Sequence, residues 1–178
     1  MSDFEKIKEN FEQFVSIIKR FEDENLSTLV ESLEQRIATS PANAQKDEYG
    51  CEDGGLIASM LETLTMIRKL DAATGKQCDP KSLYKVALLH DIGRIGTTSE
   101  EYCLPQDSDW HYEKLGLVYK RNQNLYQYNP VQFTFQLLTN YGVKLSEEEY
   151  NAIQSISLNK PLNHLGKLLL AARLITNY

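Results

Sequence analysis

The N-terminal segment carries apolar side chains at a helical period. They alternate at intervals of three and four residues, which places them on one stripe of a helix: Phe4, Ile7, Phe11, Phe14, Ile18 and Phe21. Such a stripe usually packs into the core of its own chain, but a repeat of about 3.5 residues also suits the pairing of two chains in a homodimer. A second amphipathic segment, 26–37, ends before Pro41, because proline disfavours a helical residue immediately before it.

The same kind of pattern recurs along the rest of the chain. It predicts helices over 56–70, 80–91, 131–141, 146–156 and from 161 onward, with a short helix at 112–119 inside the irregular segment 92–130. Asp79 suits a helix cap and Pro80 a first helical position. Ser146 with Glu149 forms a capping box. No strand pair is indicated, so the chain is predicted to be all-α, a bundle of about six to seven helices.

Length and composition place the chain among globular domains. Its 178 residues suffice for one domain with a sizeable core, and 42% hydrophobic with 25% charged residues argue against disorder. The formal net charge of -6, without a dense Lys/Arg run, disfavours nucleic acid as a partner. Mononucleotides, small phosphorylated molecules and proteins are the partners that this charge favours.

The sequence also indicates the compartment. The opening MSDFEKIKEN lacks the apolar region of a signal peptide, and no stretch approaches the roughly 18 apolar residues of a membrane span. The three cysteines share no CxxC spacing, so neither a disulfide framework nor a zinc knuckle is suggested. We therefore expect a cytoplasmic protein without a membrane segment.

A histidine and an aspartate stand side by side in residues 88–96, LLHDIGRIG, where an apolar helix gives way to a glycine-containing stretch. With its flanking motifs, this stretch resembles the HD-domain superfamily of metal-dependent phosphohydrolases, in particular small single-domain members common in bacteriophages. The motifs that match in order are Ser40-Pro41-Ala42, Gly54-Gly55-Leu56, Leu88 to Arg94, Trp110-His111 with Gly116, Tyr119 and Asn122, and Leu145-Ser146 with Glu148. The resemblance implies an HD core over 40–178, preceded by a helical pair over 1–39.

The resemblance also implies a divalent metal, Mn2+, Mg2+, Zn2+ or Ni2+, bound by His90 and Asp91 with further ligands. Several of those ligands are replaced here. Ser59 stands where a histidine is expected after Gly-Gly-Leu, the 154–157 stretch has none, and Ala171-Ala172-Arg173 replaces a late Ala-Asp pair. Two adjacent residues make a poor cage for a hydrolytic cation. We therefore expect at most a vestigial or weak metal site at His90 and Asp91 and assign no catalytic residue.

Three interpretations of the His90-Asp91 dyad are open at this stage. It could be structural, with Asp91 accepting hydrogen bonds from the following loop and His90 packed between helices. It could retain a divalent metal ion that it binds only weakly. It could also belong to a rebuilt site completed by His111 and by Asp107 or Asp109, in which case the chain is an active nucleotide phosphohydrolase.

The candidate ligand-binding residues all follow the dyad in the sequence: Arg94, Trp110, His111, Lys114 and Tyr119. Arg94 could grip a phosphate through two parallel hydrogen bonds, or pair with Glu100 or Glu101. Aromatic residues of the 110–128 segment could stack a base, or cover a small core.

The function predicted from the sequence is binding without efficient hydrolysis. The ligand would be a nucleotide or another phosphorylated small molecule, or a protein partner for which the domain acts as inhibitor or adaptor. No cofactor is expected unless the metal site is active.

Overall fold

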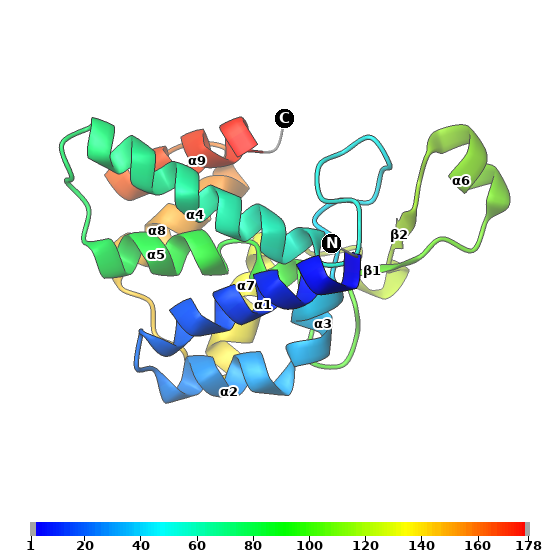
Figure 1. The fold of residues 1–178 in the computed structure, drawn as a ribbon, viewed down its shortest axis with the longest axis horizontal. Coiled ribbons are helices and arrows are strands. Elements are labelled where there is room, and N and C mark those ends of the chain that lie inside the picture. Colours follow the sequence, from blue (N-terminus) through cyan, green and yellow to red (C-terminus); the bar gives the residue numbers. More distant parts are fainter. Residues whose placement is uncertain (1–2, 177–178) are drawn as a thin grey trace.

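Helices make up most of the fold, as the amphipathic pattern predicts (Figure 1). The computed structural model describes residues 3–176, and within that range it contains nine α-helices, two 3-10 helices and one small antiparallel sheet. The all-α prediction is confirmed, with more helices than the expected six to seven. No helix in the described range has both the length and the apolar character needed to cross a bilayer.

The elements follow one another along the chain in this order: α1 (Asp3–Lys19), α2 (Glu24–Ser32), α3 (Glu34–Thr39), α4 (Gly55–Ala73), α5 (Pro80–Leu89), η1 (Ile92–Ile95), β1 (Cys103–Pro105), α6 (Asp109–Leu115), β2 (Tyr119–Arg121), η2 (Gln123–Leu125), α7 (Pro130–Asn140), α8 (Glu147–Leu158) and α9 (His164–Thr176).

The N-terminal part contains three helices where the sequence predicted two. The expected helix over 26–37 is broken at Leu33, whose backbone leaves the helical region while its side chain stays buried. On α1 the apolar stripe turns into the core of its own chain at Phe14 and Ile18, whereas Phe4 is 74% exposed. The stripe therefore serves mainly this chain's own core, and Phe4 is the member most available to a second chain.

The central bundle is built from α4, α5, α8 and α9. Helix α4 packs against both α5 and α9, and α8 packs against α9. Leu56, Met60 and Ile67 of α4 are fully buried, and one continuous hydrophobic cluster joins them to Phe14 of α1. That cluster spans the predicted boundary between 1–39 and 40–178. Burying this apolar surface is the main term that stabilises the arrangement.

Local capping signals place the helices as predicted. The Asp79 side chain accepts a hydrogen bond from the Ser82 backbone N–H at 2.8 Å, and Pro80 follows at the first helical position. Ser146 and Glu149 form the predicted capping box, with both reciprocal hydrogen bonds present. These caps satisfy backbone N–H groups that have no partner inside their own helix.

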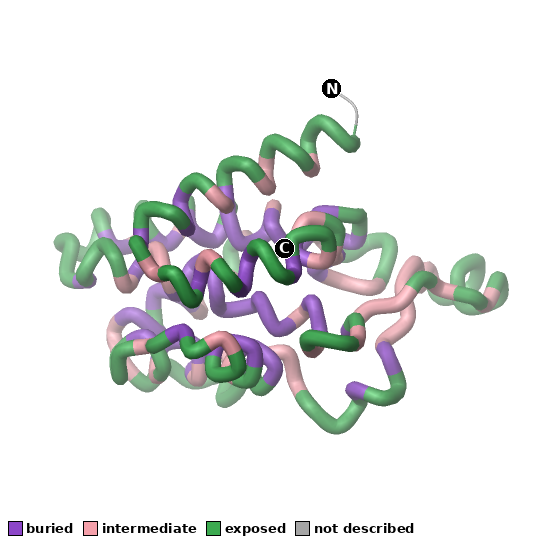
Figure 2. The backbone as a smooth tube through the Cα atoms, turned by 90° about the horizontal axis from the view of Figure 1, so that it is seen from below, coloured by how far each residue is buried: buried purple, intermediate pink, exposed green. Residues whose placement is uncertain are grey.

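The hairpin over residues 103–121 was not predicted. Strands β1 and β2 pair antiparallel, and the short helix α6 joins them. The short helix was expected over 112–119 but begins at Asp109, because Ser108 caps it by accepting the His111 N–H. Figure 1 shows α6 standing away from the bundle, and α6 buries none of its residues. Figure 2 shows the same extension with an exposed or half-buried backbone, while the buried segments run through the body.

A glycine fixes the turn that follows α5. Gly93 of η1 lies directly against α7, and a Cβ added there would lie 2.0 Å from the Pro130 carbonyl oxygen. No other residue type fits without moving one of these segments apart. The close approach holds the stretch after the His90-Asp91 dyad against α7.

Candidate functional site

The His90-Asp91 dyad lies at the end of α5, inside the bundle. His90 is the C-terminal cap residue of the helix and is 1% exposed. Its Nδ1 lies 2.9 Å from the Ala87 carbonyl oxygen, which can only accept, so Nδ1 carries the proton. The other ring nitrogen, Nε2, then carries no proton and lies 3.7 Å from Asp91 Oδ2.

A threonine on α7 fixes the backbone of the dyad. Thr134 Oγ1 donates to the His90 carbonyl oxygen at 3.2 Å and accepts the Gly93 N–H at 2.9 Å. All three groups are buried. The hydroxyl thereby satisfies one acceptor and one donor that the change from α5 to η1 leaves without helix partners.

Asp91 is held between two arginines that meet on the same carboxylate oxygen. Arg94 Nε donates to Asp91 Oδ2 at 3.1 Å, and Arg173 Nη2 donates to it at 2.8 Å. Arg94 comes from η1, whereas Arg173 comes from α9, 82 residues after Asp91 in the chain. The Asp91 side chain is buried, so this oxygen sits in a medium where charge interactions are strong.

The arginines set the ionisation of the site. Burial by itself would raise the pKa of Asp91, but the positive charges of Arg94 and Arg173 outweigh it and hold the pKa of that carboxyl well below its usual range. Burial lowers the pKa of His90 to about 4, and the neighbouring Asp91 carboxylate offsets only part of this effect. At neutral pH the site therefore contains a neutral imidazole, an ionised carboxylate and two guanidinium groups.

Two guanidinium groups supply the positive charge beside the Asp91 carboxylate. A divalent cation approaching Asp91 Oδ2 would have to displace two charge-assisted hydrogen bonds and would face two positive charges. Arg173 directly follows Ala172, which stands where the resemblance places a late carboxylate. The geometry fits a structural dyad, in which the partners of Asp91 are side chains of this chain rather than the amides of the following loop.

Arg94 contacts groups of its own chain in this structure. Its Nε is bonded to Asp91, and its Nη1 donates to the Ala42 carbonyl oxygen at 2.7 Å. Neither of the acidic partners considered from the sequence pairs with it. The loop containing those residues is instead held by Arg36, which donates to the carbonyl oxygens of Thr97, Thr98 and Glu100.

The other four predicted ligand residues belong to the hairpin. Trp110, His111 and Lys114 are exposed on α6, and Tyr119 lies on β2 with its hydroxyl donating to Asp53 at 2.7 Å. His111 and Tyr119 both line a cavity of about 610 Å³ beside the hairpin, whereas the other three predicted residues do not. The five residues are therefore not assembled into one pocket.

The aromatic residues of this region divide into two groups. Tyr102 and Phe133 meet edge to face, with ring centroids 6.0 Å apart, and form a small second core with Leu125. The guanidinium of Arg121 lies 4.9 Å from the ring centroids of both Tyr102 and Tyr126. These rings cover a small core and one cation. Trp110 and Tyr112, in contrast, face solvent.

One group of three candidate metal ligands exists among residues 3–176, and the dyad is not part of it. The group consists of Asp71, Cys78 and His164. His111 and the hairpin aspartates do not combine with His90 and Asp91 into such a group within the described range. The sequence did not single out these three residues together.

Comparisons of this chain with protein-family models, with curated proteins and with solved structures give no match.

The buried carboxylate makes a sharp prediction for stability. Asp91→Ala would leave two guanidinium groups without their shared counter-charge, which costs about 3–5 kcal/mol when a buried pair is broken. Asp107→Ala removes the partner of Lys120 at an exposed ion pair and should change the free energy of unfolding far less, because solvent screens this pair. Urea denaturation of both variants measures the difference. Equal, small effects would contradict the charge assignment.

His90 predicts how stability depends on pH. Its pKa is about 4 in the folded chain against an ordinary 6.5, so between these values the unfolded chain binds a proton that the folded chain does not. Stability is therefore complete above about pH 6.5 and falls toward pH 4, by about 3 kcal/mol at roughly 1.4 kcal/mol per pH unit. The free energy of unfolding measured over this range should lose most of its slope in His90→Gln and keep it in His111→Gln. Unchanged slope in His90→Gln would count against a buried neutral imidazole.

Proposed function

We propose that this chain is a non-hydrolytic domain of the HD type that acts by binding a protein partner through the hairpin over residues 103–121. The observation that carries the first part is the position of the Asp91 carboxylate between Arg94 and Arg173. Hydrolysis at an HD-type centre relies on a divalent cation that generates hydroxide and offsets developing charge. Here the carboxylate that would hold the cation is bonded to two guanidinium groups.

The hairpin supports the second part of the proposal. Helix α6 buries none of its residues, and Trp110, Tyr112 and Leu115 are 58%, 51% and 46% exposed. Large apolar side chains on a projecting element cost solubility without adding to the core, and such exposure is typical of interaction sites. Tryptophan and tyrosine are also the residue types that most often dominate the energy of protein interfaces.

A phosphorylated small molecule is the second candidate ligand, and the cavity beside the hairpin favours it. The cavity is of the size that small ligands occupy and is lined by His111, Tyr119, Lys120 and Arg121. Lys120 and Arg121 already have partners, Asp107 and the Tyr128 carbonyl oxygen, so a phosphate would compete with existing bonds. For this reason we place the protein partner first.

The hairpin can be tested without knowing the partner in advance. Tagged full-length chain is cross-linked in lysate, and the recovered proteins are quantified for wild type, for Trp110→Ser with Tyr112→Ser, and for Leu158→Ser with Leu174→Ser as a control of comparable exposure. We expect a specific protein whose recovery falls at least about 10-fold in the hairpin variant, as loss of an interface hot spot implies, and stays unchanged in the control. Equal recovery with all three chains would refute the hairpin as the binding element. Heat stabilisation by a panel of nucleotides, lost in Lys120→Ala, would favour the second candidate instead.

Absence of turnover has its own test. Phosphate release from a panel of nucleotides with Mn2+, Mg2+, Zn2+ or Ni2+ should not exceed that of the His90→Ala, Asp91→Ala double variant. The reason is that the arginines already occupy the carboxylate that a catalytic cation would need. Metal-dependent release that the double variant abolishes would establish an active phosphohydrolase and overturn the first part of the proposal.

A further inference from the structure

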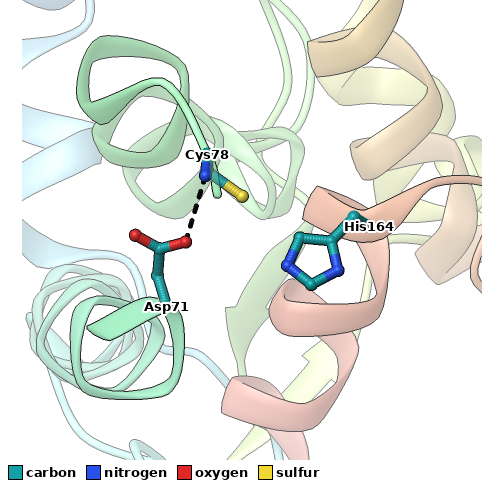
Figure 3. A group of neighbouring side chains, drawn as sticks. All are labelled: Asp71, Cys78 and His164. Atoms are coloured by element: carbon teal, nitrogen blue, oxygen red, sulfur yellow. Dashed lines mark hydrogen bonds between the residues drawn. The ribbon is translucent and has the colours of Figure 1, made fainter. Parts of the chain in front are cut away.

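Three side chains of the kinds that bind zinc meet at the opposite end of α5 from the dyad. Asp71 comes from the last turn of α4, Cys78 from the loop before α5, and His164 from the start of α9. Figure 3 shows the three side chains facing a common space from these elements. One ligand atom of each lies within 4.8 Å of the others.

The loop between α4 and α5 is folded around the Asp71 carboxylate. Asp71 Oδ1 accepts the backbone N–H groups of Gln77 and Cys78, both at 3.1 Å. The chain reverses through Gly75 and Lys76, both with positive φ, and the Lys76 N–H donates to the Asp71 carbonyl oxygen at 2.8 Å. The backbone thus delivers the Cys78 thiol to the carboxylate through several bonds rather than through a chance approach of two surface groups.

His164 provides a second, independent observation. Its Nε2 is buried and makes no hydrogen bond to any described residue. A buried polar atom without a partner is unfavourable, and such atoms in folded proteins call for a specific explanation, an ion among them. The other histidines differ, since His90 and His111 each have a hydrogen-bonded ring nitrogen.

We propose that Asp71, Cys78 and His164 form a Zn2+ site that ties the start of α9 to the α4–α5 loop. Thiolate, imidazole and carboxylate together are a donor set that suits zinc better than magnesium or calcium. Zinc bonds of about 2.0–2.3 Å put tetrahedral ligand atoms roughly 3.5 Å apart, so a group already within 4.8 Å needs only a small contraction. Three protein ligands leave the fourth position to water.

The surroundings are compatible with metal entry. A cavity of about 650 Å³ is lined by Asp71 and Cys78, so these two ligands are reachable from solvent. The ion would displace the thiol proton of Cys78 as it binds. Helix α9 also carries Arg173, so the ion would anchor the helix that supplies one of the two arginines to Asp91.

Cobalt replacement tests the site directly, because a thiolate bound to Co2+ gives a near-ultraviolet charge-transfer band. Full-length chain stripped with chelator should bind one Co2+ with this band and with the visible absorption of tetrahedral cobalt, and Zn2+ should displace it and raise Tm. Cys78→Ser should lose the band, and His164→Gln should weaken binding more than about 10-fold, since it removes a direct ligand. Cys103→Ser and His111→Gln are matched controls, which should leave the thiolate band and the Co2+ affinity unchanged.

The possible outcomes separate this site from the dyad. Failure to bind one Co2+, or a thiolate band that survives Cys78→Ser, would overturn the proposal. Metal held at His90 and Asp91 instead would give no thiolate band and would be insensitive to Cys78→Ser, which also overturns it. If Cys78→Ser does not fold, His164→Gln still decides, because unchanged Co2+ affinity in that variant is incompatible with the site.

Discussion

The fold is organised around a buried carboxylate that two guanidinium groups share. Asp91 lies at the junction of α5 and η1, Arg94 one turn later, and Arg173 on the last helix, so this one cluster joins segments from both halves of the chain. Removing three charges from water costs free energy, and the attraction between them offsets this cost only while their geometry is kept. The cluster therefore constrains how α9 sits against the end of α5. The same constraint keeps Asp91 Oδ2 bonded to two cationic side chains.

Sequence alone predicted the parts of the fold that depend on local signals. Apolar stripes and caps such as Asp79-Pro80 act within one or two turns, so the main helices could be placed closely. The strands β1 and β2 have three residues each, too few to show an alternating pattern, and they escaped prediction. The break at Leu33 was missed for a related reason, because the apolar spacing continues through it and only tertiary packing interrupts the helix.

The position of the His90-Asp91 dyad at a helix end could be predicted from the sequence, but its hydrogen-bond partners could not. His90 and Asp91 stand at a helix end inside a recognisable motif, whereas the bond between Asp91 and Arg173 spans 82 residues and has no local signal. The one available hint was that Ala172 replaces an expected acid and is followed by Arg173, because a positive charge there can pair with a lone carboxylate. The group formed by Asp71, Cys78 and His164 is equally non-local, because its histidine comes from a different helix. Membership in the HD superfamily stays a prediction that rests on the sequence motifs.

The separation of α6 from the bundle has a consequence for how this protein can change over evolutionary time. Because the helix buries no side chain, amino-acid replacements along it leave the core contacts untouched and should be nearly neutral for folding. The surrounding scaffold tolerates fewer replacements. Gly93 packs directly against α7, and Asp91 is paired with two arginines beside it. Sequence change can thus accumulate quickly on α6 while the body of the fold stays fixed.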